Sequence, residues 1–415
     1  MTKMPTSVQP KGRKISHTIS FEDTSTAFSD QSNWELKKTY FIFACMNHNW
    51  LVKIGTFFIK LFFNLNLPIK NLIKNTVFDH FCGGETIEGC RKTVEKLDHA
   101  HIGTILDYSV EGEDSERSFD ATVQEILRTI EKSSKTPAVP FSVFKVTGVA
   151  SSELLERVQN GLPLDEAEVA AFERVRQRVD LLCRSAHDWN VNLFVDAEES
   201  WIQDTIDALA YEMMARYNQK GAVVYNTYQL YRRDSYDNLV KATETAREMG
   251  YCLGAKLVRG AYMERERQRA HEMEYCEPVY ATKEETDHDF NRAIDYCLEN
   301  RYVVSICLGT HNEYSSLYLA KEMRCRGVAA NDPHFWFAQL LGMSDNISYN
   351  LAKAGYNVAK YVPYGPVEAV MPYLFRRAEE NTSVAGQASR EFTLIKRELE
   401  RRKHQAHRRK KAANP

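Results

Sequence analysis

Short apolar runs alternate with longer, charge-rich segments of helical period along the chain from about residue 100 onward. Eight of these runs are rich in β-branched residues and have the length of a strand, and a helical segment follows each one. The predicted strands are residues 102–108, 139–146, 191–196, 221–226, 254–259, 302–308, 327–331 and 357–362. Near-continuous apolar strands indicate a parallel sheet whose outer face is covered by helices.

Eight such βα units predict an α/β fold, a TIM-like (β/α)8 barrel, which typically takes about 250 residues. The alternative is a doubly wound open sheet, but no GxGxxG sequence follows any of the eight strands. Barrel enzymes carry their chemistry at the carboxyl ends of the strands. Here those ends carry Asp107, Lys145, Asp196, Asn226, Lys256, Arg259, Thr310, His311, Asp332 and Tyr361. One polar residue per strand would be ordinary loop chemistry, whereas the whole set predicts a site lined by basic and acidic groups.

The segment after the last predicted strand has the pattern of a helix with four polar residues on one face. Tyr373, Arg376, Arg377 and Glu380 stand at positions i, i+3, i+4 and i+7. A paired guanidinium fork suits a carboxylate, because planar donors bind both oxygens at once. The spacing therefore predicts a clamp for a small carboxylate ligand, ordered in part by Glu380. The alternative is a solvated helix face that holds one exposed ion pair.

The remainder of the chain divides into three parts around the barrel, which we place at residues 99–392. We expect residues 1–38 to be a disordered extension, residues 39–98 a helical segment, and residues 393–415 a basic tail. Within the helical segment, residues 39–75 are the most hydrophobic stretch, but lysines interrupt it and no uncharged apolar run reaches 18 residues. It either packs on the barrel as amphipathic helices or lies on a membrane surface with its aromatic side chains inserted.

Charge and cysteine content narrow the picture further. The net charge is −2, yet residues 396–411 carry nine Lys or Arg against two Asp or Glu, so the remainder is acidic. The nine cysteines are scattered without CxxC or zinc-like spacing, which indicates reduced thiols and no metal site. The residues alone leave three classes open: an enzyme that binds a phosphate-bearing cofactor and an anionic substrate, a barrel with a Schiff-base lysine like an aldolase, and a non-catalytic barrel whose tail binds nucleic acid or membrane.

Several sequence blocks, in order, resemble the proline dehydrogenase family, the FAD-dependent enzymes of proline catabolism. The blocks are FCGGE (81–85), ILDYSVEG (105–112), FKVTG (144–148), FVDAEE (194–199), YNTYQ (225–229), KLVRGAYMERER (256–267), GTHN (309–312), YVPYG (361–365) and YLFRRAEEN (373–381). KLVRGAY and YLxRRxxEN are the specific ones, whereas GTHN alone would be weak. The resemblance spans residues 81–381, nearly the entire predicted barrel.

The resemblance implies a distorted (β/α)8 barrel whose last helix lies over the mouth, and a monofunctional enzyme. It implies that Arg376 and Arg377 bind the proline carboxylate and that Asp196 balances the basic pocket. The other substrate-pocket and supporting positions that it implies are Lys145, Tyr262, Tyr361, Tyr373 and Glu380. For the flavin, it implies contacts from Ala197, Arg259, Gly260, Ala261, Thr310 and His311.

Two positions depart from the pattern of many bacterial members. Lys256 stands where those members have an Arg facing flavin N5, and it can still donate as a single, flexible ammonium. Asn226 stands where they have a Gln near the flavin pyrimidine, and Gln229 is the alternative for that contact. Both departures also occur in the eukaryotic-like branch, so we expect activity to be kept, with Asp196 and Lys256 as the catalytic pair.

The expected reaction is the oxidation of L-proline to Δ1-pyrroline-5-carboxylate by hydride transfer to FAD, with electrons passed to a quinone. A hydroxyproline dehydrogenase is the nearest alternative. Because a quinone is dissolved in the membrane, we expect peripheral membrane association and no nucleic-acid partner. We expect a bacterial cytoplasmic enzyme on the inner membrane, with the matrix side of the mitochondrial inner membrane as the alternative.

Overall fold

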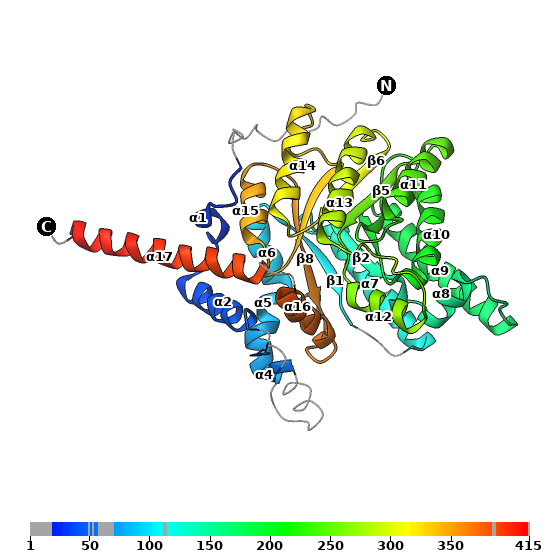
Figure 1. The fold of residues 1–415 in the computed structure, drawn as a ribbon, viewed down its shortest axis with the longest axis horizontal. Helices are drawn as coiled ribbons and strands as arrows, with labels where there is room; N and C mark the ends of the chain where they lie inside the picture. Colours follow the sequence, from blue (N-terminus) through cyan, green and yellow to red (C-terminus); the bar gives the residue numbers. More distant parts are fainter. Residues whose placement is uncertain are drawn as a thin grey trace.

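The central feature of the fold is a closed barrel of eight parallel strands, which confirms the predicted architecture (Figure 1). The computed structural model describes residues 19–48, 50–51, 54–56, 70–110, 114–383 and 387–413. The strands are β1 (Gly103–Tyr108), β2 (Phe141–Lys145), β3 (Asn192–Asp196), β4 (Val224–Gln229), β5 (Leu253–Val258), β6 (Val304–Gly309), β7 (Phe335–Leu340) and β8 (Val358–Tyr364). Each pairs with its sequence neighbours, and β8 closes on β1.

Seven of the eight predicted strands are found within a few residues of their expected places, but the seventh is wrong. It was placed at residues 327–331, whereas β7 is Phe335–Leu340. Gly327 adopts a left-handed φ of 69° just after α14, so the short apolar run there belongs to a turn. Asp332 consequently lies before β7 rather than after it, and its Oδ1 accepts a hydrogen bond from the His334 backbone N–H. Asp332 is therefore not at the carboxyl end of the barrel.

Helices cover the outside of the barrel, and capping side chains begin some of them. Capping boxes begin α9, with Asp165 and Glu168, and α13, with Thr282 and Glu285. The helices after β1 are α7 (Glu116–Lys135), the 3-10 turn η2 (Val146–Gly148), α8 (Ser152–Gln159), α9 (Glu166–Asp188), α10 (Ser200–Tyr217), α11 (Ser235–Met249), α12 (Met263–Glu272), α13 (Lys283–Glu299), α14 (Glu313–Cys325), α15 (Asp345–Lys353), α16 (Met371–Ser383) and α17 (Gln387–Ala413).

Aromatic side chains fill the interior of the barrel near the amino ends of its strands. Phe141 and Phe194 stack with their ring centroids 4.5 Å apart. Tyr225 and Trp336 meet Phe141 edge-on, at centroid distances of 5.7 and 5.1 Å. This packed floor leaves space for a ligand only toward the carboxyl ends of the strands.

The N-terminal part is more ordered than the sequence indicated. Ahead of β1 lie α1 (Thr24–Ala27), α2 (Asn33–Met46), α4 (Lys70–Ile73), the π-helix η1 (Lys74–Phe78), α5 (Asp79–Phe81) and α6 (Arg91–His99). Residues 19–38, expected to belong to a disordered extension, contain α1 and the start of α2, because Phe28 and Leu36 are buried against α17. Residues 1–18 lie outside the described part.

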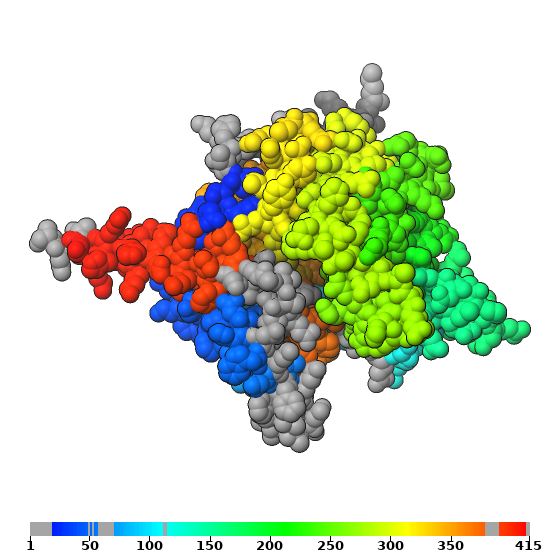
Figure 2. Space-filling view, viewed as in Figure 1, coloured from blue at the N-terminus to red at the C-terminus, as the bar shows by residue number. Residues whose placement is uncertain are grey.

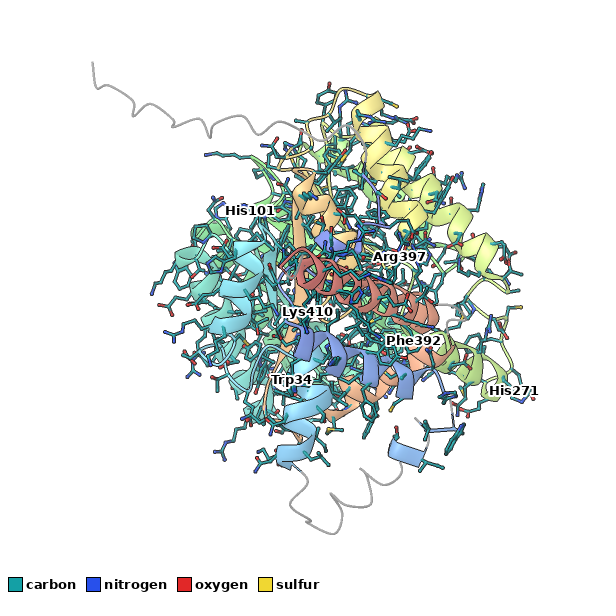
Figure 3. All side chains as sticks on the ribbon, turned by 90° about the vertical axis from the view of Figure 1, so that its left-hand side faces the viewer. Trp34, His101, His271, Phe392, Arg397 and Lys410 are labelled. Carbon is teal, nitrogen blue, oxygen red and sulfur yellow. The ribbon has the colours of Figure 1, made fainter. Side chains whose placement is uncertain are left out.

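The expected basic tail is also a helix that packs on the body of the protein. α17 lies alongside α2, and the two share an apolar cluster that includes Leu36, Phe43, Leu394 and Ile395 (Figure 3). Its far end projects away from the barrel and is exposed (Figure 2). The beginning of α17 is therefore part of the fold, whereas its last three turns carry exposed basic side chains.

Candidate active site

A cavity of about 400 Å³ opens at the carboxyl ends of the strands, and all eight strands contribute to its wall. The predicted residues that line it are Asp107, Lys145, Asp196, Ala197, Gln229, Lys256, Arg259, Gly260, Ala261, Tyr262, Thr310, His311, Tyr361, Tyr373, Arg376 and Arg377. Of the remaining predicted site residues, Asn226 does not line the cavity, and the side chain of Glu380 lies outside the described part. Six cationic side chains face two carboxylates in the lining, so the cavity suits an anionic ligand.

The centre of the cavity is a buried charge cluster built on β3, β5 and β8. The Lys256 ammonium donates to Asp196 Oδ1, and the Tyr361 hydroxyl donates to Asp196 Oδ2 at 2.5 Å. The same ammonium lies 5.1 Å from the ring centroid of Phe194 and 4.9 Å from that of Tyr361. Burial, followed by the nearby Asp107 and Asp196, raises the pKa of Tyr361 well above its usual value, so the phenol stays a neutral donor.

A second cation, Lys145 at the end of β2, stands beside this cluster. Tyr262, followed by the carboxyl groups of Glu198 and Asp107, raises the pKa of Lys145 against the opposing effects of burial and Arg376. The Thr147 backbone N–H donates to Glu198 Oε1 at 3.0 Å and fixes the position of that carboxyl group. Lys145 therefore remains protonated and adds positive charge to the cavity.

The predicted arginine clamp enters the cavity from α16, which follows β8. Arg377 is buried and its guanidinium carbon lies 5.1 Å from the ring centroid of Tyr373. Arg376 is half-buried and lines the same cavity. Two guanidinium groups on adjacent helical positions, in a cavity that Lys145 and Lys256 also line, suit a carboxylate ligand.

Another part of the cavity wall is organised by Arg259, which follows β5. Its guanidinium donates to Asp287 Oδ1 and Thr310 Oγ1, each at 2.7 Å, and to Ser315 Oγ at 3.0 Å. The guanidinium carbon also lies 4.2 Å from the ring centroid of Phe290. A side chain fixed by so many partners presents its charge rigidly, as a site for a phosphate-bearing cofactor requires.

Gly260 permits the chain to turn sharply after Arg259. It has a φ of 137°, and a Cβ atom there would lie 2.4 Å from the ring of Tyr231. No other residue type fits that position without moving the tyrosine. The turn brings Ala261 and Tyr262 into the cavity wall.

The structure does not bring Asn226, predicted to contact a cofactor, into the cavity wall, whereas its alternative, Gln229, lies there. Successive side chains of a strand point to opposite faces, and Asn226 points outward, where its Nδ2 donates to Asp207 Oδ1 on α10 at 2.8 Å. Gln229 points inward. Its Nε2 donates to the Glu198 carbonyl at 2.6 Å and its Oε1 accepts from the Ala261 N–H at 3.2 Å.

Several lining residues were missed by the sequence analysis. They are Ile105, Thr227, Val258, Lys283, Gly309, Asn312, Ala338, Gln339, Leu340 and Met343. Gln339 and Leu340 were lost because β7 had been placed too early, although the run FWFAQL has the composition of a strand. Lys283 begins α13 and no local signal distinguished it from a surface lysine. Among the described residues, no group of His, Cys, Asp or Glu is arranged to hold a metal ion.

A parallel (β/α)8 barrel with a cavity at its carboxyl-terminal mouth is typical of enzymes, and the cationic lining suits a small anionic ligand. Comparison with known proteins assigns the family. The family model described as proline dehydrogenase matches residues 90–390. The chain belongs to the proline dehydrogenase family.

Two curated relatives and one solved structure describe the range of this similarity. Mitochondrial proline dehydrogenase 1 of Dictyostelium discoideum is 31% identical over 426 residues, covering 92% of this chain and 74% of the relative. Hydroxyproline dehydrogenase of Xenopus laevis is 30% identical over 423 residues, covering 92% and 90%. Proline utilization A from Bdellovibrio bacteriovorus matches with a TM-score of 0.69 at 19% identity; the match covers 88% of this chain and 37% of that one. The last comparison supports the fold alone.

Proposed function

We propose that this chain oxidises L-proline to Δ1-pyrroline-5-carboxylate with FAD as the bound cofactor. The observation that carries the proposal is the convergence of Arg376 and Arg377 with the Asp196–Lys256–Tyr361 cluster in one cavity of a proline dehydrogenase family member. Two guanidinium groups bind the substrate carboxylate, and the buried cluster then faces the pyrrolidine ring.

The lining fits the chemical parts of FAD. Arg259, Lys283 and Thr310 supply cationic and hydroxyl donors suited to phosphate groups. Val258 and Met343 supply apolar surface for a flat ring system. Lys256, Ala197, Gln229, Gly260, Ala261 and His311 are the further residues that would hold the cofactor.

The oxidation removes a hydride from C5 and a proton from the amine, so the C5–N single bond becomes a double bond. FAD supplies the acceptor for that hydride when it is bound. The clamp fixes the carboxylate and thereby the ring, which is an effect of proximity and orientation. Lys145, Lys256 and the two arginines lower the pKa of the substrate amine, since nearby positive charge disfavours its protonated form. Asp196 holds Lys256 and Tyr361 in place for this arrangement.

A Schiff-base mechanism is less well supported by the geometry. A lysine nucleophile must be neutral, but the pKa of Lys145 is raised and the Lys256 ammonium is engaged by Asp196. The test is the visible spectrum of the purified protein under anaerobic conditions. We expect flavin absorption that bleaches on addition of L-proline. A colourless protein that forms a borohydride-trapped adduct with substrate would overturn the proposal.

Hydroxyproline is the second candidate substrate, because the relative from Xenopus laevis that covers nearly the whole chain is a hydroxyproline dehydrogenase. The choice between the two is read from kcat/KM for L-proline and for trans-4-hydroxy-L-proline, measured with one enzyme preparation. We expect the larger value for L-proline, since the Tyr361 ring narrows the pocket and its hydroxyl is already bonded to Asp196. A larger value for hydroxyproline would assign the second function.

Transfer of electrons to a quinone requires the enzyme to reach a membrane, and we propose a peripheral contact through α2 and the projecting end of α17. Among the described residues, no helix is long and apolar enough to cross a bilayer. Trp34, Phe41, Trp50 and Leu72 are large apolar residues exposed by at least 62%. Part of the hydrophobic stretch 39–75, namely residues 49, 52–53 and 57–69, lies outside the described part. The mitochondrial name of the Dictyostelium relative favours the inner mitochondrial membrane over the bacterial one.

Flotation with anionic liposomes tests this contact. Removing everything after Ile395 would also remove Glu398, which accepts from the Thr24 hydroxyl in the fold, so substitution is the cleaner change. We compare the full chain with a variant in which Arg408, Arg409, Lys410 and Lys411 are all replaced by Gln. These side chains are exposed, and each basic group contributes about 1 kcal/mol near an anionic surface. We expect the variant to float less at low salt; a full chain that stays soluble at low salt refutes the proposal.

A further inference from the structure

The loop between β7 and α15, residues 341–344, forms part of the cavity wall and is held from outside the barrel. Met343 lines the cavity. The Gly342 carbonyl lies 3.0 Å from Nε2 of His80 on α5, and the Met343 carbonyl accepts from the ammonium of Lys360 on β8. The loop is thus held by α5, which lies outside the barrel, and by β8.

Ser344, the last residue of this loop, has an unusual conformation and an unusual partner. It is fully buried and adopts φ 52° and ψ 42°, the left-handed region that non-glycine residues rarely occupy. It stands at the N-cap of α15, yet its hydroxyl makes no capping hydrogen bond. Instead, Ser344 Oγ lies 2.9 Å from Nδ1 of His311, which lines the cavity.

The backbone of Ser344 is in turn held by Glu391 of α17. The Ser344 N–H donates to Glu391 Oε1. Glu391 is 3% exposed, and the charged groups that face it are Lys360 on β8, Asp345 on α15 and Glu313 on α14. Burying a carboxyl group costs desolvation free energy, which its hydrogen bond to the loop offsets in part.

We infer that Glu391 is a positioning residue for the cavity, acting through Ser344 on His311. The Glu391 carboxyl holds the left-handed backbone of Ser344, and that backbone aims the Ser344 hydroxyl at the His311 ring. This places a residue of the helix beyond the barrel in control of a side chain that would contact the cofactor. The claim that His311 contacts the cofactor rests on the proposed function, whereas the contacts from Glu391 through Ser344 to His311 do not.

α17 contains a matched control for this inference. Glu398 is also a fully buried glutamate of α17, but it accepts from Thr24, Arg401 and Arg402 and has no contact with the loop. Replacing Glu398 loosens the packing of α17 without touching Ser344. Replacing Glu391 breaks the connection to Ser344.

The experiment compares four full-length variants with the unchanged chain: Glu391→Ala, Glu391→Gln, Ser344→Ala and Glu398→Ala. The first measurement uses flavin-free protein with 13C-labelled histidine, in which the His311 ring signal is identified by its loss in His311→Asn. The second measurement is the dissociation constant for FAD by fluorescence titration of the same samples. The histidine signal does not depend on flavin, so it tests the Glu391–Ser344–His311 contacts whether or not the protein binds FAD. If the unchanged protein binds no FAD, the proposed function is refuted, but this inference is not.

We expect Glu391→Ala and Ser344→Ala to shift the His311 signal and to weaken FAD binding by about tenfold, the effect of one lost buried hydrogen bond. Glu391→Gln keeps an acceptor for the Ser344 N–H and should stay close to the unchanged protein. Glu398→Ala should lower the Tm and leave both readouts unchanged. An unmoved His311 signal in Glu391→Ala and Ser344→Ala, or an equal shift in Glu398→Ala, would overturn the inference. Should Glu391→Ala fail to fold, Ser344→Ala decides alone.

Discussion

Two lysine–carboxylate pairs of this protein make equally close contacts in opposite surroundings. Lys256 and Asp196 meet at the barrel mouth with side chains 9% and 14% exposed, whereas Lys135 and Glu131 meet on the surface of α7 with side chains 69% and 47% exposed. Water and salt screen the outer pair, and its net contribution is small. The inner pair is little screened, so removing one partner leaves a buried charge uncompensated. Distance alone therefore does not tell which ion pair matters; the surroundings do.

The largest expected effect comes from breaking the inner pair. Lys256→Ala should fold, lose about 3 kcal/mol of stability and disturb flavin affinity, flavin potential or turnover, because Asp196 is left with Tyr361 alone. Denaturant unfolding measures the first effect, and spectra and kinetics measure the others. The double variant Lys256→Ala/Asp196→Asn should be more stable than Lys256→Ala, because it removes the unpaired buried charge. Wild-type spectrum, potential and kcat in Lys256→Ala would mean that this lysine does not face the cofactor.

The next effect concerns the two clamp arginines, half-buried Arg376 and buried Arg377, which bind the substrate carboxylate in the proposed function. Arg376→Met or Arg377→Met should raise the KM for proline roughly tenfold to more than a hundredfold, because each loses a charge-assisted hydrogen bond worth about 1.5–3 kcal/mol. FAD affinity should change far less, since neither arginine is among the residues proposed to hold the cofactor. Steady-state kinetics and a flavin titration separate the two quantities. An unchanged KM for proline in both variants would show that these arginines do not bind the substrate carboxylate.

A smaller effect is expected from the pH dependence of a buried acid. Burial raises the pKa of Glu391 from about 4.5 to about 7. The folded protein therefore holds this proton more tightly than the unfolded chain, and stability should fall as the pH rises from about 4.5 to about 7. Glu391→Gln lacks this titration, so its stability relative to the unchanged protein should rise by about 1–2 kcal/mol between pH 6 and pH 8. Parallel urea titrations at the two pH values measure the difference, and identical pH slopes would contradict it.

The smallest effect belongs to the outer pair. Lys135→Ala should lower stability by less than about 0.5 kcal/mol and leave catalysis unchanged, because an exposed i,i+4 pair contributes little. Its contribution should also disappear in high salt, whereas that of Lys256 should persist. A loss in Lys135→Ala as large as that in Lys256→Ala would show that surroundings do not govern these pairs.

The same contrast explains which parts of the molecule the sequence could predict. Strands buried on both faces leave a strong local pattern, and seven of the eight predicted strands lie within a few residues of their expected places. β7 was missed because the short apolar run at residues 327–331 was taken for the strand, although Gly327 turns the chain there with a φ of 69°. The helical start of α17 was taken for a tail because its charged residues outnumber Leu394 and Ile395, which are buried only because α2 lies beside them.

The candidate site divides in a similar way. Residues in specific motifs, such as Arg376 and Lys256, could be placed from the sequence because their neighbours identify them. Asn226 could not, since one residue of register decides whether a strand side chain points into the barrel or toward α10. Glu391 and Ser344 carry no local signal at all, because their roles arise from contacts between segments far apart in the chain.

The pairing of α2 with α17 also has a consequence for how the protein is made. Tyr40 stacks on Phe392, with ring centroids 4.7 Å apart, although hundreds of residues separate them in the chain. A ribosome adds about 5–20 residues per second, so roughly 20–70 s pass between the synthesis of α2 and that of α17, which covers its apolar face. During that interval the apolar face of α2 is exposed to solvent while the barrel is being synthesised. We expect chaperones that bind exposed apolar surfaces to increase the yield of correctly folded protein.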